Sequence, residues 1–198
     1  MKYIFKHTVI TRVMHAVHLI SMFMLILSGF YIYAPNVFRI FPSMDSARYV
    51  HFIFMYFIGW TLVYKFYYTI ATGEIKELLF TWKDVKEFPK LVKYYTFGMF
   101  VGQKKKDWGK YNPGQKLIYT AWPLLLIIQG ITGLGLYFVG TFAVFNSFLG
   151  GMANVRAWHF MISWLFTVTT IAHIYLGSTG PKIIDYYKSV VTGYEIHE

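Results

Sequence analysis

The chain has 198 residues, of which 56% are hydrophobic and 21% aromatic while only 14% are charged, and its mean hydropathy is +0.43. This composition excludes an ordinary soluble domain and indicates a membrane protein. The formal net charge is +10 and cysteine is absent, which excludes disulfides, thiolate or iron–sulfur ligation by this chain, and haem attachment through cysteine.

Four long apolar stretches follow one another along the chain. Asp, Glu, Lys and Arg are missing from 13–38, 117–155 and 157–181, and 49–73 contains only Lys65. About 20 apolar residues are needed to cross the hydrocarbon core of a bilayer. We therefore predict an all-α membrane protein with a single domain over residues 1–198, in which a cytoplasmic loop, 73–116, divides a bundle of four transmembrane helices. The predicted helices span about 13–34, 49–72, 117–139 and 157–178.

The basic residues are distributed unevenly around these stretches. Of the 19 Lys and Arg residues, 15 lie before residue 13, in the connection 73–116 or in the C-terminal tail, whereas the other two connections hold only Arg39, Arg48 and Arg156. Because Lys and Arg are enriched in cytoplasmic loops, this asymmetry predicts that both termini and the connection 73–116 are cytoplasmic. The basic run GQKKKDWGK is then explained by an anionic membrane surface, and we expect no nucleic-acid partner.

Histidines occur at matching depths in three of the predicted helices. The first helix carries His15 near its cytoplasmic end, and the second carries His51 near its outer end. The fourth carries His159 and His173, which are 14 residues apart and so lie on one face, about four turns from each other. Because successive spans alternate in direction, His15 lies at the depth of His173, and His51 at that of His159. Facing imidazoles suit the axial ligation of haem iron, so the pattern predicts two b-type haems; interfacial hydrogen bonding is the alternative for any single histidine.

Other residues near the predicted ligands bear on the same hypothesis. His18 follows His15 by three residues and is a rival ligand. Gly29, 14 residues after His15, would let a flat macrocycle approach the backbone at the level of the opposite haem. Ordinary packing of small residues is the alternative for Gly29. The third predicted helix offers the same choice at Gly130, Gly133 and Gly135.

An arginine stands three residues before each of three histidines. Residues three apart share a helix face, so these guanidinium groups are predicted to pair with haem propionates. Snorkelling of each arginine to the membrane interface is the alternative. The pairs are Arg12 with His15, Arg48 with His51, and Arg156 with His159.

Most of the chain consists of recognisable blocks: TRVMHAVHLISMFMLILSGF (11–30), ARYVHFIFMYFIGW (47–60), GKYNPGQK (109–116) and the helix with the last two histidines. From about residue 11 to residue 177 the chain resembles the membrane cytochrome b subunit of respiratory formate dehydrogenases. GKYNPGQK is the most specific block. The cytochrome b subunits of nickel–iron hydrogenases are similar in having four helices, with histidines on the first, second and fourth, but they do not share that block.

The resemblance implies a role for each histidine pair. His51 and His159 would ligate the iron of the outer haem, which receives electrons from an iron–sulfur subunit. His15 and His173 would ligate the iron of the inner haem, on the cytoplasmic side.

The resemblance also implies a quinone site beside the inner haem, with Asn112, Gly114 and Gln115 as its polar contacts. The residues are compatible with this, because Asn, Pro and Gly favour a tight turn and the two carboxamides offer donors and acceptors. A turn that merely caps the third helix is the alternative. Pro113 stands where the family has a small residue.

These features predict a dihaem electron-transfer subunit with no site of its own for the primary chemistry. It would be a multi-pass protein of a bacterial or archaeal cytoplasmic (inner) membrane, surrounded by lipid, passing electrons from an iron–sulfur subunit to menaquinone or ubiquinone. The resemblance implies a molybdenum or tungsten catalytic subunit that oxidises formate; a nickel–iron hydrogenase or another respiratory reductase is the alternative. A histidine-based proton-coupled transporter is a third hypothesis, for which an internal repeat and broken helices would be expected.

Overall fold

The computed structural model describes residues 2–104, 106–180 and 182–197. It divides into two compact units, Met1–Leu62 with Gln129–Glu198, and Val63–Ile128, which are described here separately as the first and second units. The prediction of one domain over the whole chain stays a prediction.

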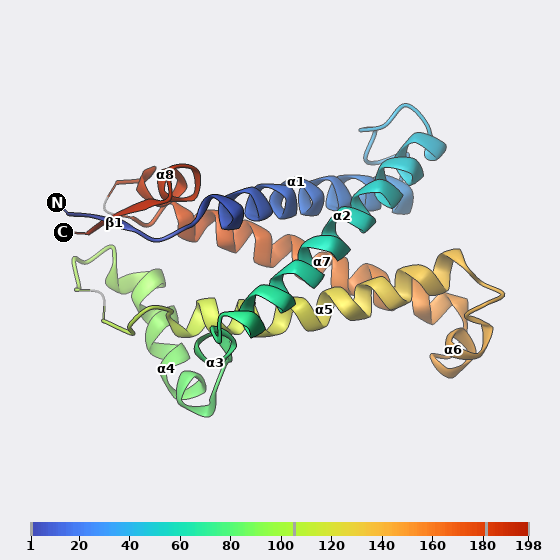
Figure 1. Cartoon of the computed structure of the whole chain (residues 1–198). Coiled ribbons are helices and arrows are strands. Elements are labelled where there is room, and N and C mark those ends of the chain that lie inside the picture. The colour runs from blue at the N-terminus through green and yellow to red at the C-terminus, as the bar shows by residue number, and fades with distance from the viewer. Residues whose placement is uncertain (1, 105, 181, 198) are drawn as a thin grey trace. The chain divides into compact units, whose positions relative to one another are not determined.

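All four predicted long helices are present in the structure (Figure 1). They are α1 Val9–Tyr33, α2 Met44–Ala71, α5 Pro113–Tyr137 and α7 Met152–Gly177. Within the described residues, α1, α5 and α7 are long and apolar enough to cross a membrane. Helix α2 is long enough but less apolar, because its 28 residues include three charged residues and five tyrosines.

Local sequence explains where these helices begin and end. The side chain of Thr8 caps α1 by accepting a hydrogen bond from the backbone nitrogen of Thr11 at 3.3 Å. Helix α1 stops at Ala34, immediately before Pro35, since proline disfavours helical backbone in the residue before it. Helix α7 follows Gly151, whose φ of 93° is a conformation that side chains rarely adopt.

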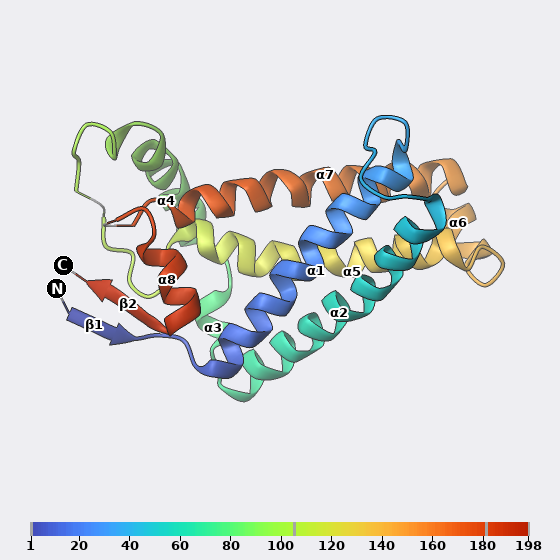
Figure 2. The same cartoon turned by 90° about the horizontal axis from the view of Figure 1, so that it is seen from above.

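The two ends of the chain are joined in the first unit, which the prediction of an all-α protein missed. Strand β1 Lys2–Phe5 pairs antiparallel with β2 Tyr194–His197 (Figure 2). In this register Phe5 lies opposite Tyr194. Their rings are in edge contact, with centroids 5.4 Å apart. The paired strands place both described ends on the same side of any membrane that the helices cross. Two short helices complete this unit, α6 Ala143–Phe148 and α8 Asp185–Thr192.

The interior of the first unit contains one buried apolar residue midway along each histidine-bearing helix. Met22, Ile58 and Phe166 are all buried. They stand seven residues after His15, His51 and His159 respectively, which is about two helical turns. The register therefore places a layer of apolar side chains between the levels of the two histidine pairs.

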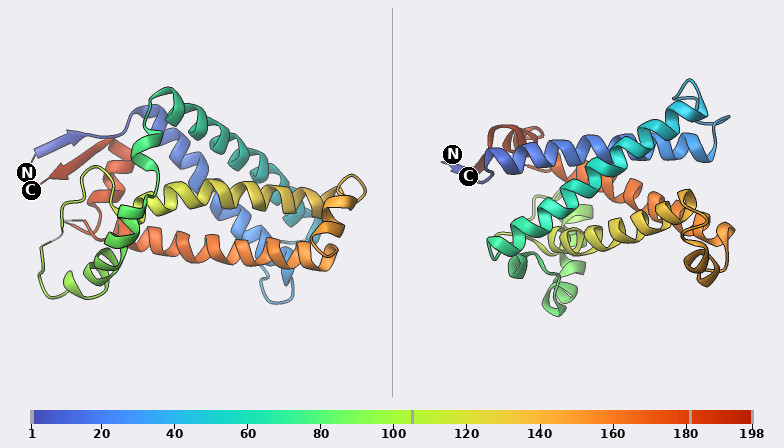
Figure 3. Two further views of the ribbon diagram at one scale, coloured as in Figure 1. Left: turned by 90° about the horizontal axis from the view of Figure 1, so that it is seen from below. Right: turned by 45° about the vertical axis from the view of Figure 1, so that its right-hand side comes forward.

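The second unit corrects the prediction that 73–116 is a loop. This connection contains α3 Ile75–Leu78, α4 Trp82–Lys93 and a π-helical turn, η1 Tyr94–Gly98 (Figure 3). Their lysine-rich composition hid these elements from a search for apolar spans. Helix α5 also begins at Pro113, four residues before the predicted start at 117.

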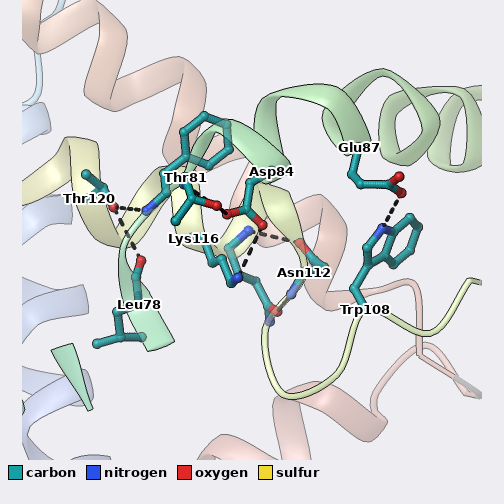
Figure 4. Close-up of polar contacts among 10 residues, drawn as sticks. Leu78, Thr81, Asp84, Glu87, Trp108, Asn112, Lys116 and Thr120 are labelled. Carbon is teal, nitrogen blue, oxygen red and sulfur yellow. Dashed lines mark hydrogen bonds and ion pairs between the residues drawn. The ribbon is translucent and has the colours of Figure 1, made fainter. Parts of the chain in front are cut away.

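A buried carboxylate joins α4 to the start of α5 (Figure 4). Oδ2 of Asp84 accepts hydrogen bonds from the backbone nitrogen and the hydroxyl of Thr81, at 2.9 and 2.6 Å, and Oδ1 lies 3.2 Å from Nζ of Lys116. Burial by itself raises the pKa of Asp84, but the bonds from Thr81 and then from Lys116 outweigh it and hold the pKa below its usual range.

We expect the Asp84→Asn protein to lose protection of α4. A hydrogen bond to a charged group contributes about 1.5–3 kcal/mol, so amide hydrogen exchange across 82–93 should accelerate by roughly one to two orders of magnitude. Because the pKa of Asp84 is lowered on folding, this stabilisation is complete above the unfolded pKa of about 4 and is lost as the pH falls through the lower folded value. Asp107→Asn, at an exposed site, is the control; equal exchange in both variants would contradict the assignment.

Candidate functional site: two histidine pairs

The structure brings the four predicted ligands together as two pairs in the first unit. The ring centroids of His51 and His159 are 6.4 Å apart, and those of His15 and His173 are also 6.4 Å apart. We call these the outer pair and the inner pair. Each pair joins α7 to another helix: the outer pair joins it to α2, and the inner pair to α1.

The spacing of each pair suits one iron atom between two imidazoles. A metal–imidazole nitrogen bond is about 2 Å long and the ring centre lies about 1 Å further on, so two rings that bind one metal have centres about 6 Å apart. The observed 6.4 Å agrees with this geometry in both pairs. His15, His51 and His159 are half-buried, and His173 is exposed. The donor set therefore fits a haem iron held by two axial imidazoles.

Both histidines of the outer pair are hydrogen-bonded to buried hydroxyl groups. Nδ1 of His51 lies 2.9 Å from Oγ of Ser28 on α1, and Nδ1 of His159 lies 3.0 Å from Oγ1 of Thr132 on α5. Ser28 donates its own proton to the carbonyl of Met24 at 2.6 Å, and Thr132 donates to that of Gln129 at 3.0 Å.

These contacts fix the tautomer of the outer pair. A hydroxyl has one proton to donate, and that proton is used within the hydroxyl's own helix, so Nδ1–H of each imidazole must donate to the hydroxyl oxygen. The lone pair of Nε2 is then available to a metal. Bonding of the remote ring nitrogen in this way orients metal-binding histidines in general.

A glycine follows each of these hydroxyl residues and lies against the same imidazole. A Cβ atom built on Gly133 would be 3.1 Å from Cε1 of His159, tighter than most real contacts, whereas one on Gly29 would be an ordinary 3.5 Å from Cε1 of His51. The side chain of Ala would therefore press on His159 but fit beside His51. In the prediction, Gly29 and Gly133 made room for a macrocycle; in the structure they face imidazole rings. Of the other two glycines, Gly130 has open space and Gly135 faces Asn146.

The rival histidine, His18, has a different neighbour. Its Nδ1 lies 2.9 Å from Oγ1 of Thr61 on α2, and Thr61 donates to the carbonyl of Ile58 at 2.8 Å. The ring that lies opposite His173 at the ligand-pair distance is that of His15. His18 also lies near His15 and His173, and the 6.4 Å spacing of the His15 and His173 rings is compatible with His15 as the ligand on α1.

The three arginines differ in their surroundings. Arg12 is half-buried, and its Nη1 donates to the carbonyl of Val191 beside α8. Its Nε is buried and has no hydrogen-bond partner among the described residues. A buried donor without a partner is rare, and an acceptor such as a propionate would satisfy it. Arg48 and Arg156 are exposed.

In the second unit, the predicted quinone residues form a helix cap. The backbone nitrogen of Asn112 donates to Oε1 of Gln115 at 3.0 Å, and the backbone nitrogen of Gln115 donates to Oδ1 of Asn112 at 2.9 Å. This reciprocal pair is a capping box for α5, the alternative named above. It uses the carboxamide oxygens and leaves the two NH₂ groups outside these bonds. Gly114 allows close packing, since a Cβ there would lie 2.9 Å from Cδ2 of Leu91.

Aromatic and charged side chains surround the start of the same block. Nζ of Lys110 contacts Glu74 and Glu77 at 3.2 and 2.9 Å. The rings of Tyr111 and Tyr119 are in edge contact with centroids 5.4 Å apart. Nζ of Lys65 lies 5.5 Å from the centroid of Tyr119, a cation–π contact. Lys65 therefore has a partner on α5 within this unit.

The hydroxyl groups that orient the outer pair are not among the site residues predicted from the sequence. Ser28 and Thr132 each stand directly before a glycine, in LSGF and ITGL. A hydroxyl residue followed by glycine, in a helix facing a histidine helix, is the signal that would have found them. Thr61, which orients His18, has no such glycine after it.

Paired imidazoles on apolar helices define a membrane-bound b-type cytochrome, and the comparison with known families agrees. Residues 6–186 match the model of the prokaryotic cytochrome b561 family, and the chain belongs to that family. It is an integral membrane protein of electron transport, and its cofactor is haem b. It is similar to the F420 non-reducing hydrogenase II cytochrome subunit of Methanosarcina mazei, at 22% identity over 218 aligned positions that cover 93% of this chain and 80% of the relative.

Proposed function

We propose that this chain is the dihaem cytochrome b subunit of a membrane oxidoreductase and passes electrons from an iron–sulfur subunit to quinone. The two histidine pairs, each with ring centroids 6.4 Å apart, carry the proposal. When bound, haem b supplies reversible one-electron chemistry at each pair. The proposal includes a fourth membrane span in α2, cytoplasmic termini, and entry of electrons at the outer pair.

The residues of the chain hold and insulate the two sites. His51 and His159 would ligate the outer iron, oriented through Nδ1 by Ser28 and Thr132. His15 and His173 would ligate the inner iron, with Arg12 as a propionate partner. A buried apolar layer midway along the helices separates the two levels. That layer consists of Met22, Ile58 and Phe166.

Haem counting tests this function. The purified complex should contain two haem b for each copy of this chain, which reduce in two one-electron steps and show no covalent attachment. The measurement is a haem assay against protein concentration, followed by a redox titration of the b-type absorption. One haem per chain, or none, would reject the dihaem assignment and favour a different use of the histidines.

For the catalytic partner we keep two candidates. The block GKYNPGQK supports formate dehydrogenase, with a molybdenum or tungsten subunit. The similarity to a hydrogenase cytochrome subunit supports a hydrogenase partner. Metal analysis of the subunits that purify with the chain separates them, since molybdenum or tungsten indicates the first partner and nickel the second.

We place the quinone contacts at Asn112, Gly114 and Gln115, where the carboxamide NH₂ groups would donate to a quinone carbonyl. Asn112→Asp and Gln115→Glu keep the oxygen atoms that cap α5, remove these donors and add one negative charge each. Loss of one hydrogen bond of about 1 kcal/mol should raise the KM for a soluble quinone analogue roughly fivefold in each variant. Asn112→Ala, which also removes the cap, is the comparison. A KM unchanged in the two acidic variants would mean that the block serves only as a helix cap.

A further inference from the structure

Helix α4 presents two parallel rows of side chains toward solvent. The first row is apolar, and each residue of the second is the lysine that follows it in the sequence. The spacing of i, i+3, i+7 and i+10 keeps each row on one side of the helix. The apolar row is Trp82, Val85, Pro89 and Val92, and the lysine row is Lys83, Lys86, Lys90 and Lys93; all eight are exposed.

The apolar surface continues beyond the helix. Trp82 is 74% exposed, and Phe97, Phe100 and Val101, in and just after the π-helical turn, are each 71% exposed. Large apolar side chains this exposed, following one another from α4 into the π-helical turn, mark an interaction surface. We call Trp82, Val85, Pro89 and Val92 with these three residues the α4 apolar surface.

The acidic residues of α4 are turned away from this surface. Asp84 is buried against Thr81 and Lys116. Glu87 binds Lys106 at 2.6 Å and Lys90 at 2.7 Å, and these bonds lower its pKa to about 2. Residues 82–110 contain eight lysines and three acidic residues. The outward field of α4 is therefore positive.

The opposite face of α4 is attached to the beginning of a membrane helix. Asp84 pairs with Lys116, three residues after the start of α5, and Leu91 packs beside Gly114. Trp108 Nε1 adds a hydrogen bond to Glu87 at 3.3 Å (Figure 4). The apolar run of α5 begins at Leu117, so the junction that holds α4 lies where α5 enters the hydrocarbon core.

We propose that α4 is an interfacial helix whose apolar surface inserts into the headgroup region of an anionic lipid bilayer. The candidate membrane span in α5 begins at the α4–α5 junction, and a membrane-surface helix characteristically combines an apolar face with adjoining lysines. The lysines neutralise lipid phosphates, while Trp82 lies at the interface that tryptophan prefers and the phenylalanines belong to the inserted apolar face. This inference is independent of the proposed electron transfer.

The absence of cysteine makes a direct test possible. Single cysteines at Val85→Cys and Val92→Cys, in the full-length protein with its native haem, carry spin labels in nanodiscs of phosphatidylglycerol and phosphatidylcholine. The apolar-row labels should collide severalfold more with dissolved oxygen, which concentrates in lipid, than with a water-soluble nickel chelate. Lys86→Cys and Lys93→Cys, one residue further on, are the matched controls and should show the reverse.

Two results of the spin-label experiment would overturn the proposal. If the nickel chelate reaches positions 85 and 92 as readily as 86 and 93, the surface faces water and the proposal is wrong. If the labels at 85 and 92 are shielded from both reagents, a protein covers the surface and the lipid assignment is overturned. A second measurement needs no cysteine variant and serves if those variants fail to assemble. The tryptophan fluorescence contributed by Trp82 is the part that the Trp82→Phe substitution removes, and brominated lipids should quench that part.

The lysine row allows a second test of the proposal. Changing Lys83, Lys86, Lys90 and Lys93 together to Gln, or replacing phosphatidylglycerol by phosphatidylcholine, should move the labels at 85 and 92 toward the water-soluble reagent. Combining the four lysine substitutions with the change of lipid should alter the accessibility of the labels little more than either change alone. If neither the lysine substitutions nor the lipid charge changes the accessibility of the labels, the electrostatic part of the proposal is refuted.

Discussion

Replacing His51 with alanine is expected to remove one of the two haems and to leave the other in place. His51 and His159 form the outer pair, so the variant leaves one imidazole where ligation of the proposed haem by two histidines would need both. The inner pair belongs to different positions on α1 and α7 and keeps its geometry. A haem assay should give about half of the wild-type content, and a redox titration should show one transition in place of two.

The proposed pairing also predicts the haem content of variants at the other histidines. His159→Ala should remove the same haem as His51→Ala, while His15→Ala and His173→Ala should remove the other. His18→Ala is the matched control, because His18 is also a partly buried imidazole on α1 but is bonded to Thr61. It should retain both haems. Loss of the same haem from His51→Ala and His15→Ala would show that the pairs are wrongly assigned.

The helical repeat explains how far the sequence could predict this site. Fourteen residues separate His159 from His173, close to four turns, and alternating helix directions match each of them with one other histidine. These two regularities are global properties of a bundle and need no side-chain detail. The structure accordingly brings together the same pairs that the sequence predicted.

Contacts that depend on rotamers could not be predicted in the same way. Asn112 and Gln115 offered either a quinone contact or a helix cap, and only the positions of their oxygen atoms show the capping box. Likewise, Ser28 and Thr132 look like ordinary small residues of an apolar helix. Their importance emerges only when the facing helix is placed and its histidine nitrogen lies within 3.0 Å.

The elements outside the long helices were missed for a different reason. Helix α4 has few apolar residues on its buried face, chiefly Leu91 and Phe88, and its stability relies on Asp84, whose partner Lys116 is 32 residues away. The strands β1 and β2 pair across nearly the whole chain. Local sequence patterns contain little information about such distant partners. For this reason the connection 73–116 was predicted to be a loop and the two ends of the chain were predicted to lack strands.

The hydroxyl groups of the outer pair lead to the second large expected effect. In Ser28→Ala, Nδ1–H of His51 loses the hydroxyl of Ser28 and keeps the carbonyl of Leu25 as its acceptor. The imidazole then becomes a weaker electron donor, which disfavours ferric iron, so the midpoint potential of the outer haem should become more positive. A tenfold shift in the ferrous-to-ferric ratio corresponds to about 59 mV. Loss of such a partner also weakens metal binding by about 10–100-fold, so part of the outer haem should dissociate on dilution.

Ser21 provides a closely matched control on the same helix. It is one heptad before Ser28, is 1% exposed against 0% for Ser28, and donates to the carbonyl four residues earlier at the same 2.6 Å. Ser21→Ala therefore removes the same hydroxyl and the same helix bond, but within the described part of the chain the bond of Ser21 goes to the carbonyl of Val17 and not to a histidine. Thr132→Val should repeat the effect through His159, and Thr132→Ser should restore it. If Ser28→Ala and Ser21→Ala changed the outer potential equally, the shift would come from helix packing, and the orienting role of the hydroxyls would be refuted.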